Sequence, residues 1–369
     1  MIKKKIAIFG STGSIGKCLI DIIKKDKKNF EIVLLSADEN YKELLKQAKF
    51  FKVNNLIITN PKSFYKIKQD KYLKKKKIFN NFDELGKIFK KKIDYTMCSI
   101  SGIQGLKPTI EIIRFTKKIA IANKEAIICG WDLIEKRLKK HKTEFVPVDS
   151  EHFSIWYALR GTQKSLIDKI YLTASGGPFL GKSKKKLEKV NINQAINHPN
   201  WKMGKKISID SATMINKVFE VIEAKKIFKI PYKKISILIH PKSYVHALIK
   251  FKNGLTKIIV HDTNMKIPIF NSLYSSKNIV NSKNLDFKIL SHLDFRNVNL
   301  KEFPLVRVLK ILPPDTSLFE TILVSINDKF VELFLNNKIK FTDISKKMNK
   351  ILNFYSLKKY KNIKPKNIE

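Results

Sequence analysis

The sequence is poor in cysteine, in acidic residues and in long apolar runs. Its three cysteines, Cys18, Cys98 and Cys129, are odd in number and lack the Cys-x-x-Cys spacing of zinc or redox sites. This excludes a disulfide framework and indicates a reducing, cytoplasmic compartment. No segment reaches the roughly 18 to 20 uninterrupted apolar residues of a membrane helix. The first apolar run begins too early to leave room for a signal peptide. We therefore expect a soluble cytoplasmic protein with no membrane partner.

Acidic residues are far outnumbered by basic ones. Lys and Arg total 74 and Asp and Glu total 32, which gives a formal net charge of +42. Such a balance is typical of proteins that bind nucleic acid. Here, however, lysine is spread along the whole chain among many Ile, Asn and Phe residues, and this indicates compositional bias rather than a binding surface. We expect no nucleic-acid partner. A basic nucleic-acid-binding protein with a vestigial nucleotide-binding domain remains the alternative, which salt-sensitive binding of nucleic acid without cofactor binding would support.

Residues 5–22 predict a strand, a glycine turn and a helix. The apolar run Ile6–Phe9 precedes the turn Gly10–Gly16 (GSTGSIG), and Lys17–Lys25 has helical periodicity. This order places backbone N–H groups at a helix N-terminus, where a dinucleotide's phosphates bind. Because the spacing is not G-x-G-x-x-G, an unrelated α/β unit stays possible at this point. Further strands are expected at 30–35, 55–58, 95–99 and 119–122, so the fold class is α/β with a Rossmann-like, doubly wound parallel sheet.

A chain of 369 residues is expected to form two or three domains. The strands expected near 170–173, 235–240, 247–251 and 256–261 indicate a second α/β domain, and Asn253-Gly254 favours an antiparallel pair at its end. From Leu305 onward apolar residues recur at helical spacing. We therefore expect an NAD(P)-binding domain over 1–149, a metal- and substrate-binding catalytic domain over 150–274, a connector over 275–302 and a small helical domain over 303–369.

Asp149 and Glu151 directly follow the apolar run Phe145–Val148. On an extended backbone, residues two apart project from the same face, so the two carboxylates are predicted to form a chelating pair. An isolated Asp-x-Glu is more often a pair of solvated charges. Here the pair is embedded in apolar sequence and followed by the glycine-serine and Ser-Asn-Lys groups that a phosphate needs, so we favour a site.

A helix predicted to start near Asp210 or Ser211 would place Asn216, Glu220 and Glu223 on one side, at i, i+4 and i+7. Glu220 then completes a set of three carboxylates with the preceding pair. Oxygen ligands of this kind suit Mg²⁺ or Mn²⁺, whereas zinc prefers His and Cys. The sequence therefore predicts a hard divalent cation beside a phosphate-binding segment.

These motifs resemble the 1-deoxy-D-xylulose 5-phosphate reductoisomerase family over nearly the whole chain. The resemblance runs through GSTGSIG, ANKE, PVDSEH, SGGPF, HPNWKMGKKISIDSATMINK, IHPKSYVH and FTDI, in the family's order. It implies a metal-dependent rearrangement of a sugar-phosphate ketose, followed by reduction of the resulting aldehyde by NADPH to 2-C-methyl-D-erythritol 4-phosphate. It also implies a homodimer and a divalent ion that is Mg²⁺, Mn²⁺ or Co²⁺. Trp201 and Met203 would belong to a loop, roughly 176–205, that closes over the substrate.

The resemblance also implies a role for individual residues. The metal ligands would be Asp149, Glu151 and Glu220, and the catalytic residues would be these three with Lys124 and His152. The substrate would be bound by Lys124, Ser150, Glu151, Ser175, His198, Ser211, Asn216, Lys217 and Glu220. The cofactor would be bound by Thr12, Gly13, Ser14, Ile15, Asn40, Asn123, Glu125 and Gly204.

One departure from the family affects the cofactor. After the second strand the family commonly has a glycine and often a basic residue, where this chain has Asp38-Glu39-Asn40. Acidic side chains there would repel a ribose 2′-phosphate and favour NADH, although the family implies NADPH. Another NAD(P)-dependent dehydrogenase, of the aspartate-semialdehyde or 3-oxoacid type, is the alternative enzyme. It would share the glycine turn but not need the carboxylates, and metal-independent turnover would support it.

Overall fold

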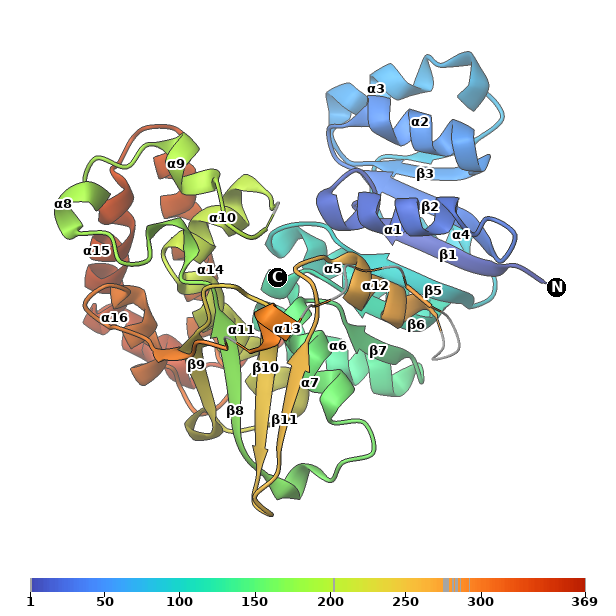
Figure 1. Ribbon diagram of the computed structural model, residues 1–369. Helices are drawn as coiled ribbons and strands as arrows, with labels where there is room; N and C mark the ends of the chain where they lie inside the picture. Colours follow the sequence, from blue (N-terminus) through green and yellow to red (C-terminus); the bar gives the residue numbers. More distant parts are fainter. Residues whose placement is uncertain are drawn as a thin grey trace. The chain divides into compact units, whose positions relative to one another are not determined.

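A computed structural model describes residues 2–201, 203–274, 279–280, 282, 285, 287–291 and 293–368. The chain divides into two compact units (Figure 1). Unit 1 contains residues 1–149, 265–280 and 368–369, and unit 2 contains residues 150–264 and 281–367. In the described part of the chain, none of the helices combines the length and apolar character needed to cross a membrane.

Unit 1 is built on a seven-stranded parallel sheet in the order β4-β3-β2-β1-β5-β6-β7. The strand order reverses beside β1, so right-handed crossovers place the helices that follow β1 and β5 on opposite faces. This confirms the predicted α/β class with a Rossmann-like, doubly wound sheet. The strands are β1 (Lys4–Phe9), β2 (Phe30–Ala37), β3 (Asn55–Ile58), β4 (Lys77–Phe79), β5 (Ile93–Cys98), β6 (Thr116–Ile121) and β7 (Glu144–Pro147). The principal helices are α1 (Ser14–Lys24), α2 (Tyr41–Phe51), α3 (Pro61–Lys68), α4 (Leu85–Ile88), α5 (Leu106–Ile112) and α6 (Lys124–Lys140).

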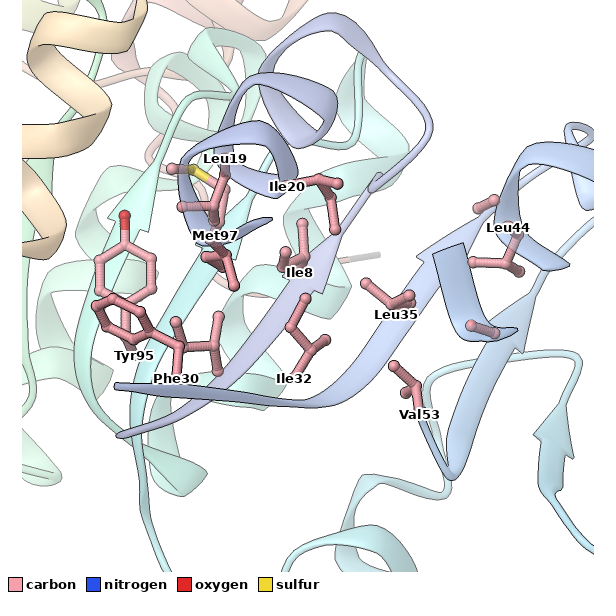
Figure 2. Packing of buried hydrophobic residues seen from close by; sticks show 14 of the residues in the cluster. Ile8, Leu19, Ile20, Phe30, Ile32, Leu35, Leu44, Val53, Tyr95 and Met97 are labelled. Atoms are coloured by element: carbon pink, nitrogen blue, oxygen red, sulfur yellow. The ribbon is translucent and has the colours of Figure 1, made fainter. Parts of the chain in front are cut away.

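The core of unit 1 forms because α1 has one apolar side. Figure 2 shows Leu19 and Ile20 of α1 beside Ile8 of β1 and Ile32 of β2, and all four side chains are buried. Burying a side chain of this size stabilises the fold by about 1.5–3 kcal/mol. This packing fixes the N-terminus of α1 at the end of β1.

Helix α12 (Lys266–Leu273) belongs to unit 1 although it follows the strands of unit 2. Its Ile269 and Leu273 join the unit 1 core. The Ser272 hydroxyl lies 2.8 Å from the Tyr95 hydroxyl of β5. The predicted catalytic segment extends to residue 274, whereas the structural boundary lies at 264, because the apolar face of α12 is buried against α1. Sequence periodicity shows such a face but not its partner.

Unit 2 contains a five-stranded mixed sheet in the order β11-β10-β8-β9-β12. β10 pairs antiparallel with β11, as Asn253-Gly254 predicts. The strands are β8 (Ile167–Ala174), β9 (Ile235–Ile239), β10 (Val245–Phe251), β11 (Thr256–Val260) and β12 (Arg296–Asn297). The helices before β9 are α7 (Ser150–Ala158), α8 (Lys184–Leu187), α9 (Ile192–Ile196), α10 (Lys205–Ala212) and α11 (Ile215–Phe228).

The last part of unit 2 is helical, in agreement with the predicted helical character from residue 305 onward. It contains the 3₁₀ segment Pro304–Lys310, α14 (Leu318–Leu335), α15 (Phe341–Leu352) and α16 (Tyr355–Lys358). The N-cap of α14 is Ser317, whose hydroxyl forms a capping box with the Glu320 carboxylate. The expected connector over 275–302 lies partly outside the described residues, and the four-residue helix α13 (Phe287–Leu290) falls within it.

Candidate active site

The glycine turn after β1 has the close approaches of a dinucleotide-binding loop. Gly10 has φ +75°, and a Cβ there would lie 2.7 Å from the Ser99 carbonyl oxygen after β5. A Cβ on Gly16 would collide with the Gly10 carbonyl. Gly13 is the N-cap of α1, and a glycine has no side chain with which to cap that end. The first turn of α1 therefore offers backbone N–H groups to a phosphate at the point where the strand order reverses. Thr12, Gly13, Ser14 and Ile15 all lie in this turn.

The segment after β2 carries the acidic side chains that the sequence singles out. Asp38 is exposed and accepts a hydrogen bond from the Thr59 hydroxyl at 2.7 Å. Asn40 is the N-cap of α2, and its Oδ1 accepts from the Glu43 N–H at 3.2 Å. In folds of this type, the ribose of the dinucleotide lies beside the end of the second strand. The acidic side chains therefore lie on the segment beside which this type of fold binds the ribose.

Asn123, Lys124 and Glu125 form the first turn of α6 with its cap. The Asn123 Oδ1 accepts from the Ala126 N–H at 2.7 Å, and its Nδ2 donates to the carbonyls of Ile100 and Gly102. Asn123 thereby ties the loop after β5 to the start of α6. Lys124 is buried and its Nζ lies 3.5 Å from the Asp149 carboxylate. Glu125 is also buried.

Asp149 and Glu151 lie at a strand-to-helix junction and not on an extended segment. β7 ends at Pro147, and α7 begins at Ser150 with Glu151 in its first turn. The extended backbone predicted from the sequence is therefore wrong, because the apolar run does not continue as a strand through the acidic residues. A carboxylate in the first helical turn is favoured by the helix dipole. The Ser150 hydroxyl donates to Glu151 Oε2 at 2.5 Å and fixes that side chain.

Glu220 lies on α11, which begins later than the sequence predicts. The predicted start near Asp210 or Ser211 falls inside α10, and Met214 then interrupts the helix with φ +63°. A left-handed residue cannot continue a right-handed helix, so α11 starts at Ile215. Although α11 starts later than predicted, Asn216 and Glu220 still lie on one face of it, since the Asn216 Nδ2 donates to Glu220 Oε1 at 2.5 Å.

His152 of α7 connects α7 to α11, and its side chain is fully buried. Its Nε2 lies 2.9 Å from the main-chain oxygen of Glu220, so this nitrogen carries the proton and donates. Its Nδ1 lies 4.0 Å from the Glu223 carboxylate. His152 therefore holds α7 against α11 and positions Glu151 relative to Glu220.

Two overlapping groups of side chains have metal-ligand geometry. The predicted set Asp149, Glu151 and Glu220 offers ligand atoms that all lie within 4.8 Å of one another, and so does the set Asp149, His152 and Glu223. Asp149 is the last residue of unit 1, and two peptide bonds connect it to Glu151. The first set offers only carboxylate oxygens, which suits Mg²⁺ or Mn²⁺. The second set contains an imidazole and only two carboxylates, and a nitrogen ligand suits a hard cation less well. The three carboxylates therefore fit the predicted metal better.

Lys217 lies among these carboxylates. Its Nζ is 2.6 Å from Glu151 Oε1 and 2.5 Å from Glu220 Oε2, and the side chain is buried. Burial alone would lower the pKa of Lys217, but the two carboxylates outweigh that effect and raise its pKa above the ordinary value. The ammonium therefore stays charged. Its predicted contact with a phosphate remains a prediction, and the structure adds its contacts with two metal-ligand candidates.

Ser175 and Ser211 lie on segments that touch each other. Ser175 follows β8 and begins the SGGPF turn, in which Gly177 has φ +67°. A Cβ on Gly177 would lie 3.1 Å from the Ser211 carbonyl oxygen and 3.0 Å from the Ala212 Cα. Only glycine permits this approach. It brings two of the predicted phosphate-binding hydroxyl groups into one region of unit 2.

His198 organises the segment before α10. Its Nδ1 accepts from the N–H groups of Asn200 at 3.2 Å and Trp201 at 3.1 Å, so its proton resides on Nε2. Nε2 then donates to the Ser175 hydroxyl oxygen at 3.0 Å, and the Gly177 N–H donates to the same oxygen. With both contacts directed at its oxygen, the Ser175 hydroxyl keeps its own proton for a ligand oxygen.

The expected closing loop contains more structure than its sequence indicates. α8 and α9 lie within 176–205, and Asn191 with Gln194 forms a capping box on α9. Lys202 lies outside the described residues. The Trp201 ring meets His246 edge to face, with ring centroids 5.9 Å apart. Gly204 is the N-cap of α10 and has no side-chain cap hydrogen bond.

Two hydrogen bonds of Asn200 anchor this loop, and the sequence did not predict them. The Asn200 Nδ2 donates to the Pro241 carbonyl at 2.6 Å and to the Ser243 hydroxyl at 3.0 Å. Asn200 directly follows His198-Pro199, and asparagine side chains commonly form hydrogen bonds to nearby backbone in turns. The sequence therefore indicated that Asn200 has a hydrogen-bonding role. Its partners across 41 and 43 residues carried no local signal.

His198 provides a testable pH dependence. Burial, with a smaller effect from Lys217, lowers its pKa from the ordinary 6.5 to about 4. Between these values the unfolded chain binds a proton that the folded chain does not, so stability falls as the pH drops from 7 toward 4. We expect His198→Asn, which keeps an acceptor for the Asn200 and Trp201 N–H groups, to reduce this loss.

Urea unfolding of both proteins at pH 7 and pH 5 measures the difference. His141, His240 and His261 also have lowered pKa values. Their contribution is shared by the two proteins and cancels in the comparison. An equal loss of stability in wild type and variant would show that His198 does not titrate as described.

Comparisons with known proteins place these features in one family. The family model described as 1-deoxy-D-xylulose 5-phosphate reductoisomerase matches residues 6–130, and models of its C-terminal domains match residues 145–228 and 261–369. A 1-deoxy-D-xylulose 5-phosphate reductoisomerase of Pelagibacter ubique (strain HTCC1062) is 60% identical over 371 residues, which cover 99% of this chain and 95% of that protein. One of Clostridium kluyveri is 38% identical and covers 96% of this chain and 93% of that protein.

Solved structures agree with the sequence comparisons. The reductoisomerase from Zymomonas mobilis in complex with NADPH has a TM-score of 0.86 at 31% identity. The match covers 100% of this chain and 94% of the Zymomonas mobilis chain. A DOX-P reductoisomerase in complex with NADPH, fosmidomycin and magnesium has a TM-score of 0.87 at 31% identity. This match covers 96% of the present chain and 90% of the DOX-P reductoisomerase chain. The resemblance predicted from the motifs is confirmed: the chain belongs to the 1-deoxy-D-xylulose 5-phosphate reductoisomerase family.

Proposed function

We propose that this protein converts 1-deoxy-D-xylulose 5-phosphate to 2-C-methyl-D-erythritol 4-phosphate with NADPH and Mg²⁺ or Mn²⁺. The observation that carries the proposal is the carboxylate group Asp149, Glu151 and Glu220, with Lys217 between two of its members. A dehydrogenase without a rearrangement step has no need of three such carboxylates. Membership of the family and the glycine turn supply the reaction type and the cofactor class.

In this proposal the three carboxylates hold the divalent ion. When bound, the ion supplies Lewis-acid chemistry to the vicinal oxygens of the substrate. Asp149 is held by Lys124, and Glu151 is held by the Ser150 hydroxyl. The Lys124 ammonium has further N–H groups that can donate to substrate oxygens, and the Ser150 oxygen can accept from a substrate hydroxyl. Burial of Lys124 and Ser150 makes such bonds stronger than they would be in water.

The phosphate and the remaining hydroxyl groups of the substrate are assigned to unit 2. The Ser175 hydroxyl, oriented by His198, donates to a phosphate oxygen, and Ser211 lies on the adjacent segment. Trp201, packed on His246, would shield the aldehyde from water. We propose the following substrate-binding residues: Lys124, Ser150, Glu151, Ser175, His198, Ser211, Asn216, Lys217 and Glu220.

The cofactor is assigned mainly to unit 1, and residues 1–149 are proposed to form the NAD(P)-binding part of the chain. The N-terminus of α1 would bind the pyrophosphate, and Asn123 and Glu125 would lie beside the nicotinamide. In this assignment, residues 150–264 provide most of the catalytic groups. The proposed cofactor-binding residues are Thr12, Gly13, Ser14, Ile15, Asn40, Asn123, Glu125 and Gly204.

A single assay tests the proposed reaction. Oxidation of NADPH or NADH is followed with 1-deoxy-D-xylulose 5-phosphate, with and without Mg²⁺ or Mn²⁺. We expect turnover that chelation of the metal abolishes and that added Mg²⁺ restores. Metal-independent turnover would favour the dehydrogenase alternative, and absence of turnover would overturn the proposal.

The acidic pair after β2 gives a prediction about cofactor choice. We expect Asp38→Gly/Glu39→Lys to bind NADPH more tightly and NADH almost unchanged, because only NADPH carries the extra 2′-phosphate charge. A new charge-assisted contact corresponds to about a tenfold gain in affinity. Titration of both cofactors against wild type and variant measures the effect. An equal response to the two cofactors, or none, would mean that these side chains point away from the ribose.

We further propose that the protein is a cytoplasmic homodimer. Within the described residues, β11 is an edge strand that pairs with β10 on one side. Leu255 and Ile258 are 65% and 42% exposed on and beside it. An apolar, unpaired edge of this kind is suited to a second copy of the chain. Light scattering should give a dimer for wild type and a smaller species for Ile258→Lys. A monomeric wild type would exclude the dimer.

A further inference from the structure

A buried asparagine in the C-terminal helices bonds the helix that carries Ser211. Asn327 lies on α14 and is fully buried, and its Nδ2 donates to Asp210 Oδ1 of α10 at 2.8 Å. The Asn327 Oδ1 has no hydrogen-bond partner among the described residues. Its neighbours on the buried side of α14 include Leu323, Val324 and Val331. Burying an amide with only one of its two polar atoms hydrogen-bonded costs folding free energy. An apolar residue would pack at this position without that cost, so the bond to Asp210 indicates a role other than packing.

Asp210 is a buried carboxylate held by two groups. Besides the Asn327 amide, it receives the Lys206 ammonium at 2.8 Å, which also lies 3.1 Å from Asp328 of α14. Asp210 is only 1% exposed. A carboxylate buried to this degree requires partners, and removal of one partner leaves an incompletely compensated charge. The network therefore holds α10 against α14 in one arrangement.

The position of Asp210 connects this network to the proposed substrate site. Asp210 directly precedes Ser211, and the left-handed residue Met214 then leads into α11. The SGGPF turn touches this same end of α10, since a Cβ on Gly177 would lie 3.1 Å from the Ser211 carbonyl oxygen. A shift of the α10 end would therefore change the placement of Ser211 relative to Ser175.

We propose that Asn327 and Asp210 are positioning residues for substrate binding. Their hydrogen bond fixes the end of α10 so that Ser211 meets the phosphate of the substrate. The C-terminal helices thus contribute to substrate affinity by fixing the position of α10. This inference rests on the proposed role of Ser211 and adds to it the element that holds Ser211 in place.

Three variants test the hydrogen bond. Asn327→Leu keeps a similar volume and removes the donor. Asn327→Asp sets a second carboxylate against Asp210. The exchange Asp210→Asn/Asn327→Asp restores a donor and an acceptor with their positions reversed. The control is Val324→Ala, which removes buried volume beside Asn327 and keeps every hydrogen-bonding group of the network.

We expect Asn327→Leu to raise KM for the sugar phosphate about tenfold, as the loss of one charge-assisted hydrogen bond predicts. kcat and the affinity for NADPH should change much less. Asn327→Asp should raise KM further, because like charges repel. The exchange should bring KM back toward wild type. Val324→Ala should lower the unfolding temperature and leave KM unchanged.

Two results would overturn the inference. One is an unchanged KM in Asn327→Leu, and the other is an increase in Val324→Ala as large as that in Asn327→Leu. If Asn327→Leu fails to fold, the KM of Asn327→Asp is compared with the KM of the exchange Asp210→Asn/Asn327→Asp. A role of Asn327 in packing alone predicts that the exchange does not restore KM. Calorimetry with a phosphonate analogue repeats the comparison without turnover. Inactivity of wild type would therefore count against the proposed function alone.

Discussion

Replacement of Glu220 by glutamine is expected to abolish turnover while the protein remains folded. Glutamine keeps the length of the side chain and its contact with Asn216 but removes one of three anionic ligand candidates. Lewis-acid stabilisation by a bound metal contributes several kcal/mol, so loss of the metal corresponds to roughly a thousandfold loss in kcat or more. Circular dichroism and an unfolding curve establish that the fold is retained.

The chain provides a matched control on the same helix. Glu223 is buried one turn after Glu220 and belongs to the alternative group with Asp149 and His152. If the three carboxylates hold the ion, Glu220→Gln should weaken Mn²⁺ binding, measured by calorimetry, far more than Glu223→Gln. The opposite order would move the metal to the alternative group, and full activity of Glu220→Gln at limiting Mg²⁺ would remove Glu220 from the metal site.

The sequence predicted the central strands of both sheets because their residues are apolar and their ends carry glycine or polar turns. β1, β2, β5 and β6 are buried in unit 1 and appear as such runs. β4 was not predicted, since Lys77–Phe79 is short, lies at the sheet edge and is preceded by lysines. Edge strands lack the continuous apolar pattern by which buried strands are found.

The sequence predicts candidate site residues, but it does not predict their local geometry. Met214 adopts a left-handed conformation that is unusual for a residue other than glycine, and nothing in its neighbours indicates a break between two helices. The helix start at Ser150 was missed because an apolar run precedes it. Contacts such as Asn327 to Asp210 join residues 117 apart, and only tertiary packing determines them.

Removal of the Lys217 ammonium is expected to weaken substrate binding much more than cofactor binding. A charge-assisted contact contributes about 1.5–3 kcal/mol, which corresponds to roughly a ten- to hundredfold loss of affinity for a phosphonate analogue in Lys217→Ala. Lys217→Met, which keeps the aliphatic part of the side chain, separates the loss of charge from the loss of packing. Calorimetry at saturating NADPH and Mg²⁺ measures both variants.

For metal affinity, the structure predicts the opposite effect of removing the Lys217 ammonium. In the wild-type protein the ammonium lies 2.6 Å from Glu151 and 2.5 Å from Glu220, and it neutralises part of their charge. Without this cation, the carboxylates attract a divalent ion more strongly, so Mn²⁺ affinity should rise or stay constant while phosphonate affinity falls. A parallel fall of both affinities would mean that Lys217 acts by holding the carboxylates in place. Unchanged phosphonate affinity would exclude Lys217 from substrate binding.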